Sequence, residues 1–408
     1  MWYTRRRHLF LLVCFKENRK MIRLFQKINL LCLVILLLLS MTSCDQILKT
    51  LSSFEPEKTS KEPNLSLPQE EPTTAESTPA VEPEQPSIGE LAYALNADSE
   101  TCTVVGIGTV KGNDITIPAY IDGHRVTAIG QGAFANCSHL ENVVIDEGIM
   151  SIEEEAFEGC RSLLGVTIPN SIISVGRFAF ADCDQFLQIE NGISYAGRWA
   201  VDCDETVISA NLRQETVGIA DNTFFNHDNL VNVKMPDTLL VIGNSAFFDC
   251  YSLSSVLIPP NTRIIGDSAF NCCVEIRSIH IPQSVVYVGG AAFAKCHGLT
   301  DVFIPGNIKV ISDLMFYDCP NLVNVTIAQG ITQIGSYAFE YCSALTDVTI
   351  PNSVTLIGDN AFEYCHDLSS IYFKGTKAEW ASILKEDDWI DGNVFYTVHC
   401  SDGDVTKQ

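Results

Sequence analysis

Cysteine is the residue type with the clearest chemical potential in this chain, and most of its cysteines are regularly spaced. Nine of the sixteen lie three residues after a phenylalanine: Cys137, Cys160, Cys183, Cys250, Cys273, Cys296, Cys319, Cys342 and Cys365. One thiol at the same place in successive turns of a repeating structure predicts a buried column, because cysteine is among the most buried small residues. Disulfide scaffolds carry a denser set of cysteines, so we expect reduced thiols.

Other chemistry is not supported by the spacing of the reactive residues. The chain has no Cys-x-x-Cys pair, and a zinc site would need ligands from four successive turns. The eight histidines are scattered, and none stands with a nucleophile in a recognisable motif. The phosphate-binding loop and the His-Glu-x-x-His motif are also missing from the sequence. We therefore expect no metal, no cofactor and no enzyme activity, and we assign no role to Cys102, Cys203, Cys272 or Cys400.

A repeat of 23 residues positions the regular cysteines. Leu345 to Cys365 shows its pattern, L-x-x-V-x-I-P-x-x-V-x-x-I-G-x-x-A-F-x-x-C. Ten phenylalanines align on it: Phe134, Phe157, Phe180, Phe224, Phe247, Phe270, Phe293, Phe316, Phe339 and Phe362. Eight of the nine intervals between them are 23 residues, and the interval from Phe180 to Phe224 is 44. A fixed period in the twenties predicts a solenoid whose coils share one core, with the phenylalanines in a single stacked column.

The residue types within one unit predict its local structure. Val348 and Ile350 are two residues apart, so both point inward from a short strand, and Pro351 ends that strand. Gly358 is expected to adopt a backbone angle that a Cβ would resist. The closing A-F-x-x-C has the spacing of one helical turn on the opposite wall of the coil.

The outward side chain between the two inward residues of each strand is the best candidate for binding. Down the chain this position holds Val144, Thr167, Lys234, Leu257, His280, Phe303, Thr326, Thr349 and Tyr372. An exposed apolar and aromatic stripe suits protein recognition, and His280 within it could make binding depend on pH. The predicted ligand-binding residues are Lys234, Leu257, His280, Phe303 and Tyr372. The alternatives are that another layer covers the stripe, or that these residues only reflect strand preference.

The unit closely resembles the BspA-like family of bacterial surface leucine-rich repeats, whose pattern has the same IP, IG, AF and C positions. The resemblance covers about Leu91 to Gly403. It implies an α/β repeat solenoid, right-handed and of the leucine-rich-repeat type, with a parallel β-sheet on one face and short helical turns on the other. It also implies adhesion to extracellular-matrix or host-surface proteins. Glycan binding and a structural spacer without a ligand are the alternatives.

The N-terminal part of the chain differs from the repeats. Residues 1–43 are interpreted as a signal segment that starts at Met21, with residues 1–20 as a mis-called extension. Met-Thr-Ser-Cys, ending at Cys44, resembles a bacterial lipobox; this implies lipidation of Cys44 and a membrane-anchored lipoprotein facing the cell exterior. An uncleaved signal anchor is the alternative. Residues 44–90, rich in Pro, Glu, Ser and Thr, predict a disordered linker.

The remaining boundaries follow the repeat. We expect an N-terminal β cap at 91–133, repeats at 134–373 and a C-terminal cap at 374–408, in which Trp380 covers the last coil. Within the repeats, residues 184–223 form an irregular coil.

Tyr195 and Trp199, in this irregular coil, have no counterparts in the other repeats. The family contains similar variant coils, which favours a structural role. A long departure from a repeat can also carry a recognition site, and these two residues are the candidates for a secondary one.

The charge balance limits the classes of partner. The formal net charge is −24 at pH 7. Such an acidic chain repels nucleic acid, since binding to phosphates requires Lys and Arg. We interpret the charge as a source of solubility for a long exposed solenoid.

Overall fold

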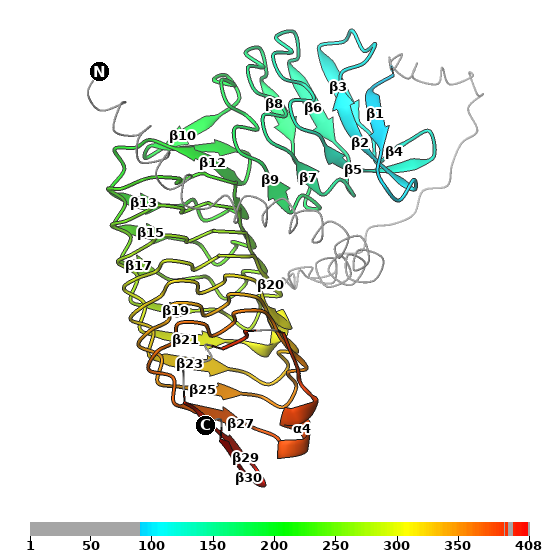
Figure 1. Cartoon of the computed structure of the whole chain (residues 1–408). Helices are drawn as coiled ribbons and strands as arrows, with labels where there is room; N and C mark the ends of the chain where they lie inside the picture. Colours follow the sequence, from blue (N-terminus) through cyan, green and yellow to red (C-terminus); the bar gives the residue numbers. More distant parts are fainter. Residues whose placement is uncertain (1–89, 387, 391–394, 407–408) are drawn as a thin grey trace, which may run out of the picture. The chain divides into compact units, whose positions relative to one another are not determined.

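The computed structural model describes residues 90–386, 388–390 and 395–406. The predicted signal segment, Cys44 and the linker up to residue 89 lie outside the described residues. The described chain is a parallel-strand solenoid of about 13 coils with turns of about 23 residues (Figure 1). None of the helical segments in the described residues has the length and hydropathy of a membrane span.

The first coils form two sheets. One has the order β1 (Ala92–Leu95), β2 (Thr101–Gly106), β5 (His124–Ile129), β7 (Ser151–Ile152) and β9 (Ser174–Val175), with β4 (Tyr120–Ile121) paired to β5. The other has the order β3 (Asp114–Ile117), β6 (Asn142–Ile145) and β8 (Gly165–Thr167). The antiparallel β1–β2 pair lies at the beginning of the described solenoid, before the parallel pairing of β2 with β5.

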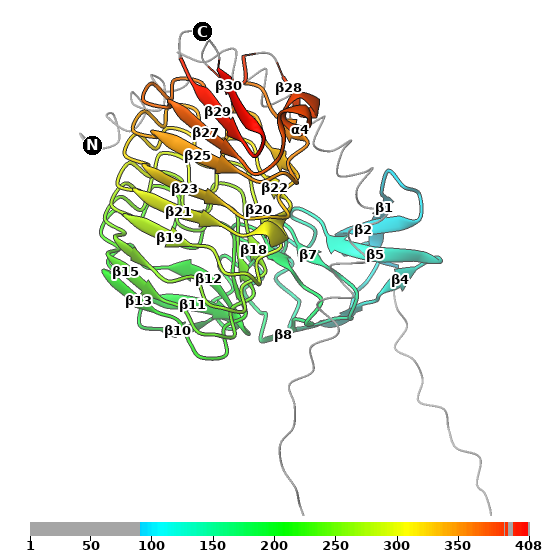
Figure 2. The same cartoon turned by 90° about the horizontal axis from the view of Figure 1, so that it is seen from below.

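The later coils also contribute to two walls (Figures 1 and 2). One wall holds β10 (Gln188–Glu190), β11 (Ile193–Ala196), β12 (Trp199–Cys203), β14 (Gly218–Ile219), β16 (Val241–Ile242), β18 (Ile264–Ile265) and β20 (Tyr287–Val288), followed by β22 (Val310–Ile311), β24 (Gln333–Ile334), β26 (Leu356–Ile357) and β28 (Leu384–Lys385). The other holds β13 (Ser209–Asn211), β15 (Asn232–Lys234) and β17 (Ser255–Val256), then β19 (Ser278–His280), β21 (Asp301–Ile304), β23 (Asn324–Ile327), β25 (Asp347–Ile350), β27 (Ser370–Phe373), β29 (Thr397–Cys400) and β30 (Gly403–Thr406). The described helical elements are the 3-10 turn η1 (Gly306–Ile308) and helix α4 (Lys377–Ser382).

Each regular coil therefore has three walls. The long-strand wall carries the V-x-I residues, as in β25, and the short-strand wall carries the two-residue strands, as in β26. The turn wall carries the A-F-x-x-C segment. The prediction of strands on one face only is wrong, because the segment that re-enters the core after the proline also pairs with its neighbours.

The prediction of helical turns on the turn wall is also wrong. In all ten aligned repeats, the residues two before and two after the phenylalanine have positive φ; in the repeat of Phe339 these are Tyr337 (φ 60°) and Tyr341 (φ 62°). Residues in this left-handed region interrupt an α-helix. Alternate backbone N–H groups instead donate to the next coil, as Phe339 does to the carbonyl of Ala361 at 2.9 Å. All three walls are thus hydrogen-bonded from coil to coil.

The repeated glycine is required for a different reason from the one predicted. Gly358 does not have a positive φ. A Cβ at Gly358 would lie 2.6 Å from the backbone nitrogen of Ser336 in the preceding coil. The glycine is therefore needed because two backbones approach closely, not because of an unusual backbone angle.

The phenylalanines form two columns, so the prediction of one unbroken column is wrong. In the first stack, the rings of Phe134, Phe157 and Phe180 are separated by 5.1 and 5.4 Å. In the second stack, the seven rings from Phe224 to Phe362 are separated by between 4.9 and 5.6 Å. Each stack has its own hydrophobic cluster.

The irregular coil lies between the two columns of phenylalanine rings and separates them. Its strands β10, β11 and β12 form an antiparallel meander instead of a repeat coil. Side chains alternate along a strand, and all four residues of β11 are buried. Tyr195 and Ala200 pack in the core of the second stack, whereas Ala196 and Trp199 pack in the core of the first. The meander therefore packs against one hydrophobic core on each side, and Ala220 and Val241, which follow it in the chain, also pack in the core of the first stack.

The cysteine column is buried as predicted, apart from a half-buried Cys137. The cysteines in the described part of the chain are free thiols. Eight Sγ atoms, from Cys160 to Cys365, donate to the carbonyl of a phenylalanine 26 residues earlier at 3.0 to 3.3 Å. His227 replaces the cysteine once, and its Nε2 lies 3.0 Å from the carbonyl oxygen of Cys203.

Trp380 packs against the last coil of the second stack. Trp380, on helix α4, is buried at 5.3 Å from the ring of Phe373 and 6.0 Å from that of Trp389. A capping box between Thr376 and Glu379 begins the helix.

Candidate functional site

The outward positions of the long-strand wall form a regular row on paired strands. Parallel pairing aligns His280 with Phe303, Phe303 with Thr326, Thr326 with Thr349, and Thr349 with Tyr372. These strands, β19 to β27, lie side by side in Figure 2. We call the line formed by Leu257, His280, Phe303, Thr326, Thr349, Tyr372 and His399 the outer row.

Most of the outer row is accessible. Leu257 is 76% exposed and Tyr372 is 42% exposed, while Phe303 is half-buried. The neighbours of Phe303 in its strand, Val302 and Ile304, are buried, so alternate side chains divide between core and surface as expected. The predicted stripe is therefore a surface feature of the second stack.

Two pairs of neighbouring rings in this row are in contact. The rings of His280 and Phe303 are 6.3 Å apart at an interplanar angle of 17°, and those of Tyr372 and His399 are 4.9 Å apart at 22°. The Nδ1 of His399 lies 3.0 Å from Oδ1 of Asp404 in the final hairpin. His399 was not predicted from the sequence, because it follows the last repeat and has no place in the 23-residue register. Its only signal is the strand-like segment that precedes Cys400.

Lys234 and Leu257 are not joined to the rest of the predicted site by continuous strand pairing. Lys234 ends β15 and is exposed, but strand pairing stops at β17 and resumes at β19. The strand-paired part of the predicted site therefore runs from His280 to His399. Lys234 and Leu257 extend it toward the irregular coil.

Tyr195 and Trp199 are not surface residues. Tyr195 is 1% exposed and Trp199 is 2% exposed. The guanidinium of Arg213 lies 4.2 Å above the ring of Tyr195, and a Cβ on Gly218 would lie 2.3 Å from the ring of Trp199. Because both side chains lie in the cores, the structure corrects the expectation that they form a secondary recognition site.

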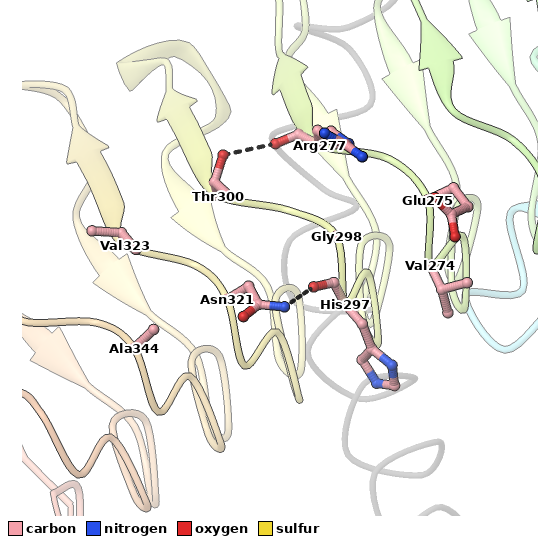
Figure 3. Close-up of a pocket in the computed structure, with 9 residues that line it drawn as sticks. All are labelled: Val274, Glu275, Arg277, His297, Gly298, Thr300, Asn321, Val323 and Ala344. Atoms are coloured by element: carbon pink, nitrogen blue, oxygen red, sulfur yellow. Dashed lines mark hydrogen bonds between the residues drawn. The ribbon is translucent and has the colours of Figure 1, made fainter.

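A shallow hollow of about 610 Å³ lies beside the outer row, at the corner between the turn wall and the long-strand wall (Figure 3). Arg277 and Thr300 line it just before strands β19 and β21. Asn321 donates to the carbonyl of His297 at 2.8 Å, and Thr300 donates to that of Arg277 at 3.2 Å (Figure 3). Much of the hollow's hydrogen-bonding capacity is therefore used to join coils.

The structure brings together few groups for metal or acid–base chemistry. Over residues 90–386, 388–390 and 395–406, no group of three His, Cys, Asp or Glu side chains is arranged to hold a metal ion. Desolvation raises the pKa of Cys296, Cys319 and Cys342 well above that of an ordinary thiol. A thiol with a raised pKa is a poor nucleophile at neutral pH.

Solved structures similar to this chain come from several bacteria. A leucine rich cell surface protein from Faecalibacterium prausnitzii is 26% identical, with a TM-score of 0.33, over 73% of this chain and 97% of that chain. A T. pallidum leucine rich repeat protein is 22% identical, with a TM-score of 0.27, over 64% and 90%. The pneumococcal vaccine antigen PcpA is 14% identical, with a TM-score of 0.35, over 72% and 96%.

Sequence comparison with families gives the stronger result. No curated protein matches the chain by sequence. A family model described as the BspA type leucine rich repeat region matches in six copies, over residues 111–201, 217–345 and 263–382. These matches span more than half of the chain and include both phenylalanine columns, the cysteine column and the outer row up to Tyr372. The chain therefore belongs to the BspA-type leucine-rich repeat family.

Proposed function

We propose that this protein is displayed on the bacterial cell surface and binds a protein partner through the outer row. The observation that carries the proposal is the row of outward side chains on paired strands, in which the ring of His280 contacts that of half-buried Phe303 and the exposed ring of Tyr372 stacks on His399. Aromatic residues on a rigid surface suit protein recognition, because they bury a large area at a small cost in conformational entropy. The lipobox-like sequence ending at Cys44 supports a lipid anchor facing the cell exterior.

The long-strand wall suits this role because its backbone does not need to reorganise. Strands β21, β23, β25, β27 and β29 are each hydrogen-bonded to neighbours on both sides, and inward residues such as Val302, Val325 and Val348 are buried. A partner would meet a preformed surface with little ordering of the backbone. Extracellular-matrix or host-surface proteins are the class of partner implied by the family resemblance.

The test replaces two outward apolar side chains by carboxylates. Leu257→Asp with Phe303→Asp should abolish binding of the full chain to its partners in a pull-down against extracellular-matrix proteins. Val144→Asp with Thr167→Asp is the matched control, since these residues hold the same outward position in the first stack. The control variant should bind normally, and both variants should keep the parent's melting temperature. If the Leu257/Phe303 variant bound as well as the parent, the outer row would not be the site.

A glycan array run with the same proteins tests the main alternative, which is glycan binding. Glycan binding that is insensitive to Leu257→Asp/Phe303→Asp would place function on another surface. The structure offers this alternative less support than the sequence did, because Tyr195 and Trp199 are buried. Absence of any ligand in both assays would favour a spacer.

A further inference from the structure

The hollow beside the outer row lies where two side chains of a regular column are missing. The column consists of the residue two places after the cysteine of each repeat, or after His227, which replaces it. Most of its members have a polar side chain: His139, Ser162, Gln185, Asn229, Ser252, Glu275, Asn321 and Asp367. Gly298 and Ala344 are the exceptions, and they come one coil before and one coil after Asn321. All four residues from Glu275 to Ala344 line the hollow.

The middle of the hollow is backbone, because Gly298 has no room for a side chain. A Cβ at Gly298 would lie 2.6 Å from the carbonyl oxygen of Val274 and 3.0 Å from that of Ile276. Figure 3 shows the bare backbone of Gly298 between Glu275 and Asn321. The volume of about 610 Å³ lies within the range of roughly 300–1,000 Å³ found for small-molecule sites.

Two side chains of opposite charge lie at one end of the hollow. Glu275 and Arg277 are both exposed, and the buried Ile276 separates them in the chain. Among the residues that the structure describes, neither side chain takes part in an ion pair or a hydrogen bond. The carboxylate of Glu275 can therefore accept hydrogen bonds from a ligand, and the guanidinium of Arg277 can donate them.

Asn321 provides a third polar group, and its orientation is fixed. Its amide nitrogen donates to the carbonyl of His297 at 2.8 Å (Figure 3). Within the described part of the chain, no donor bonds to its Oδ1, which is left as an acceptor. The ring of His297 points away from these groups, with Nε2 3.5 Å from Oδ2 of Asp318. Val323 and Ala344 complete the lining with apolar carbon atoms.

This combination of groups selects a class of ligand. A guanidinium alone would favour an anion, and a carboxylate alone would favour a cation. Side by side and not paired with each other, Glu275 and Arg277 favour a neutral ligand whose groups both donate and accept. Hydroxyl groups have this property. A metal ion is not favoured, because no group of three possible ligands converges in the described residues.

We propose that the hollow binds a segment of a neutral oligosaccharide. Sugar hydroxyls donate to Glu275 and Asn321 and accept from Arg277, while the C–H face of a ring packs on Val323 and Ala344. Because the hollow is shallow, the rest of the oligosaccharide continues along the surface in contact with water. The proposal goes beyond the proposed function, since it concerns another class of ligand and uses no side chain of the outer row.

Titration calorimetry on the full chain tests the site with four probes: cellotriose, maltotriose, mannotriose and triacetylchitotriose. We expect at least one of them to bind with a dissociation constant in the millimolar range or below. Glu275→Ala and Arg277→Ala should each weaken that binding about tenfold or more, because hydrogen bonds to charged groups are the strongest in such a site. Asp367→Ala and Arg161→Ala are the matched controls: each removes an exposed charge of the same sign outside the hollow, and each should bind as the parent does.

Ala344→Asn tests the shape of the hollow separately from its charges. It adds the side chain that Asn321 has at the same position one coil earlier, so the fold and the melting temperature should be kept. The added amide occupies the space that the sugar ring would take, and binding should be lost.

Each outcome decides for or against the site. Binding of none of the four trisaccharides at millimolar concentration overturns the proposal. Binding that Glu275→Ala, Arg277→Ala and Ala344→Asn leave unchanged also overturns it, because the sugar would then lie elsewhere. A fifth probe, a tetraglutamate peptide, identifies an anion site instead if it binds and no trisaccharide does. Leu257→Asp with Phe303→Asp should bind the trisaccharide normally, so a failure of protein binding at the outer row is distinguished from a failure of this site.

Discussion

The cysteine that ends each repeat combines burial with hydrogen bonding. Its thiol packs in the core, and its Sγ–H donates to a phenylalanine carbonyl of the preceding coil, as Cys319 does to Phe293 at 3.3 Å. An alanine would leave that carbonyl without this donor, and a leucine would not fit beside the stacked rings. This explains why cysteine recurs at a position where disulfide formation and metal binding are both unfavourable.

Two consequences can be measured on the thiols. Cys319→Ala should destabilise the fold by about 1 to 3 kcal/mol, through the unsatisfied carbonyl and a small cavity.

Native alkylation at pH 8 should label Cys137, which is half-buried, faster than Cys296, Cys319 or Cys342, because desolvation raises the pKa of the buried thiols and few thiolates form. Peptide mass spectrometry after timed labelling reports both rates. Rapid uniform labelling of the column would contradict its burial.

Glu340 links stability to pH at the residue scale. Burial, followed by the charges of Glu363, Asp318 and Asp359, raises its pKa to about 7 in the folded chain, above the usual carboxyl value, so the folded state binds the proton more tightly than the unfolded state. The stabilisation by this proton is lost as pH rises through the folded pKa. Glu340→Gln should therefore raise the melting temperature at pH 8 and change it little at pH 4. Calorimetric scans at the two pH values check the sign, and a lower melting temperature at pH 8 would contradict it.

At the scale of the element, the turn wall depends on close backbone contact. Gly358→Ala would place a Cβ 2.6 Å from the backbone of Ser336, and this should destabilise the fold by about 1 to 3 kcal/mol or more. Gly165→Ala is the comparison, since its Cβ would meet only the side-chain Oδ1 of Asn142, at 3.1 Å. Chemical denaturation of both variants gives the two free energies of unfolding. Equal values would show that the close approach at Gly358 is easily relieved.

Sequence periodicity predicted the strands and the cysteine column correctly, but not the conformation of the turn wall. Strand alternation and the fixed period were enough for the inward residues of β25, the exposed outer row and the cysteine column. They were not enough for the turn wall, because its left-handed positions hold ordinary residues such as Phe178 and Tyr337. These conformations are imposed by hydrogen bonds to the next coil, which no local pattern records. The raised pKa of Glu340 could not be predicted for the same reason, since the acidic residues that contribute to it lie in neighbouring coils.

At the scale of the whole described solenoid, the irregular coil joins two stacks that would otherwise unfold separately. In a solenoid, stability is the sum of the coils and of the contacts between neighbours. The contact between the two stacks includes the β11–β12 meander, where Trp199 lies in the core of the first stack and Tyr195 in that of the second, and also Ala220 and Val241, which pack in the core of the first stack. A single weak interface in such a series decides whether unfolding is cooperative.

Trp199→Ala should therefore change the number of unfolding transitions as well as the melting temperature. Loss of the buried indole should cost about 3 to 5 kcal/mol, concentrated at the boundary between the stacks. The expected result is two calorimetric transitions in place of one, because the first stack loses its cover while the second keeps its own core. Phe270→Leu is the control: it weakens the second stack internally, away from the boundary, and should lower the melting temperature without adding a transition. If Trp199→Ala unfolded in one transition with the parent's cooperativity, the meander would not be the coupling element, and contacts such as the hydrogen bond from Asp221 to the carbonyl of Val175 would hold the stacks together instead.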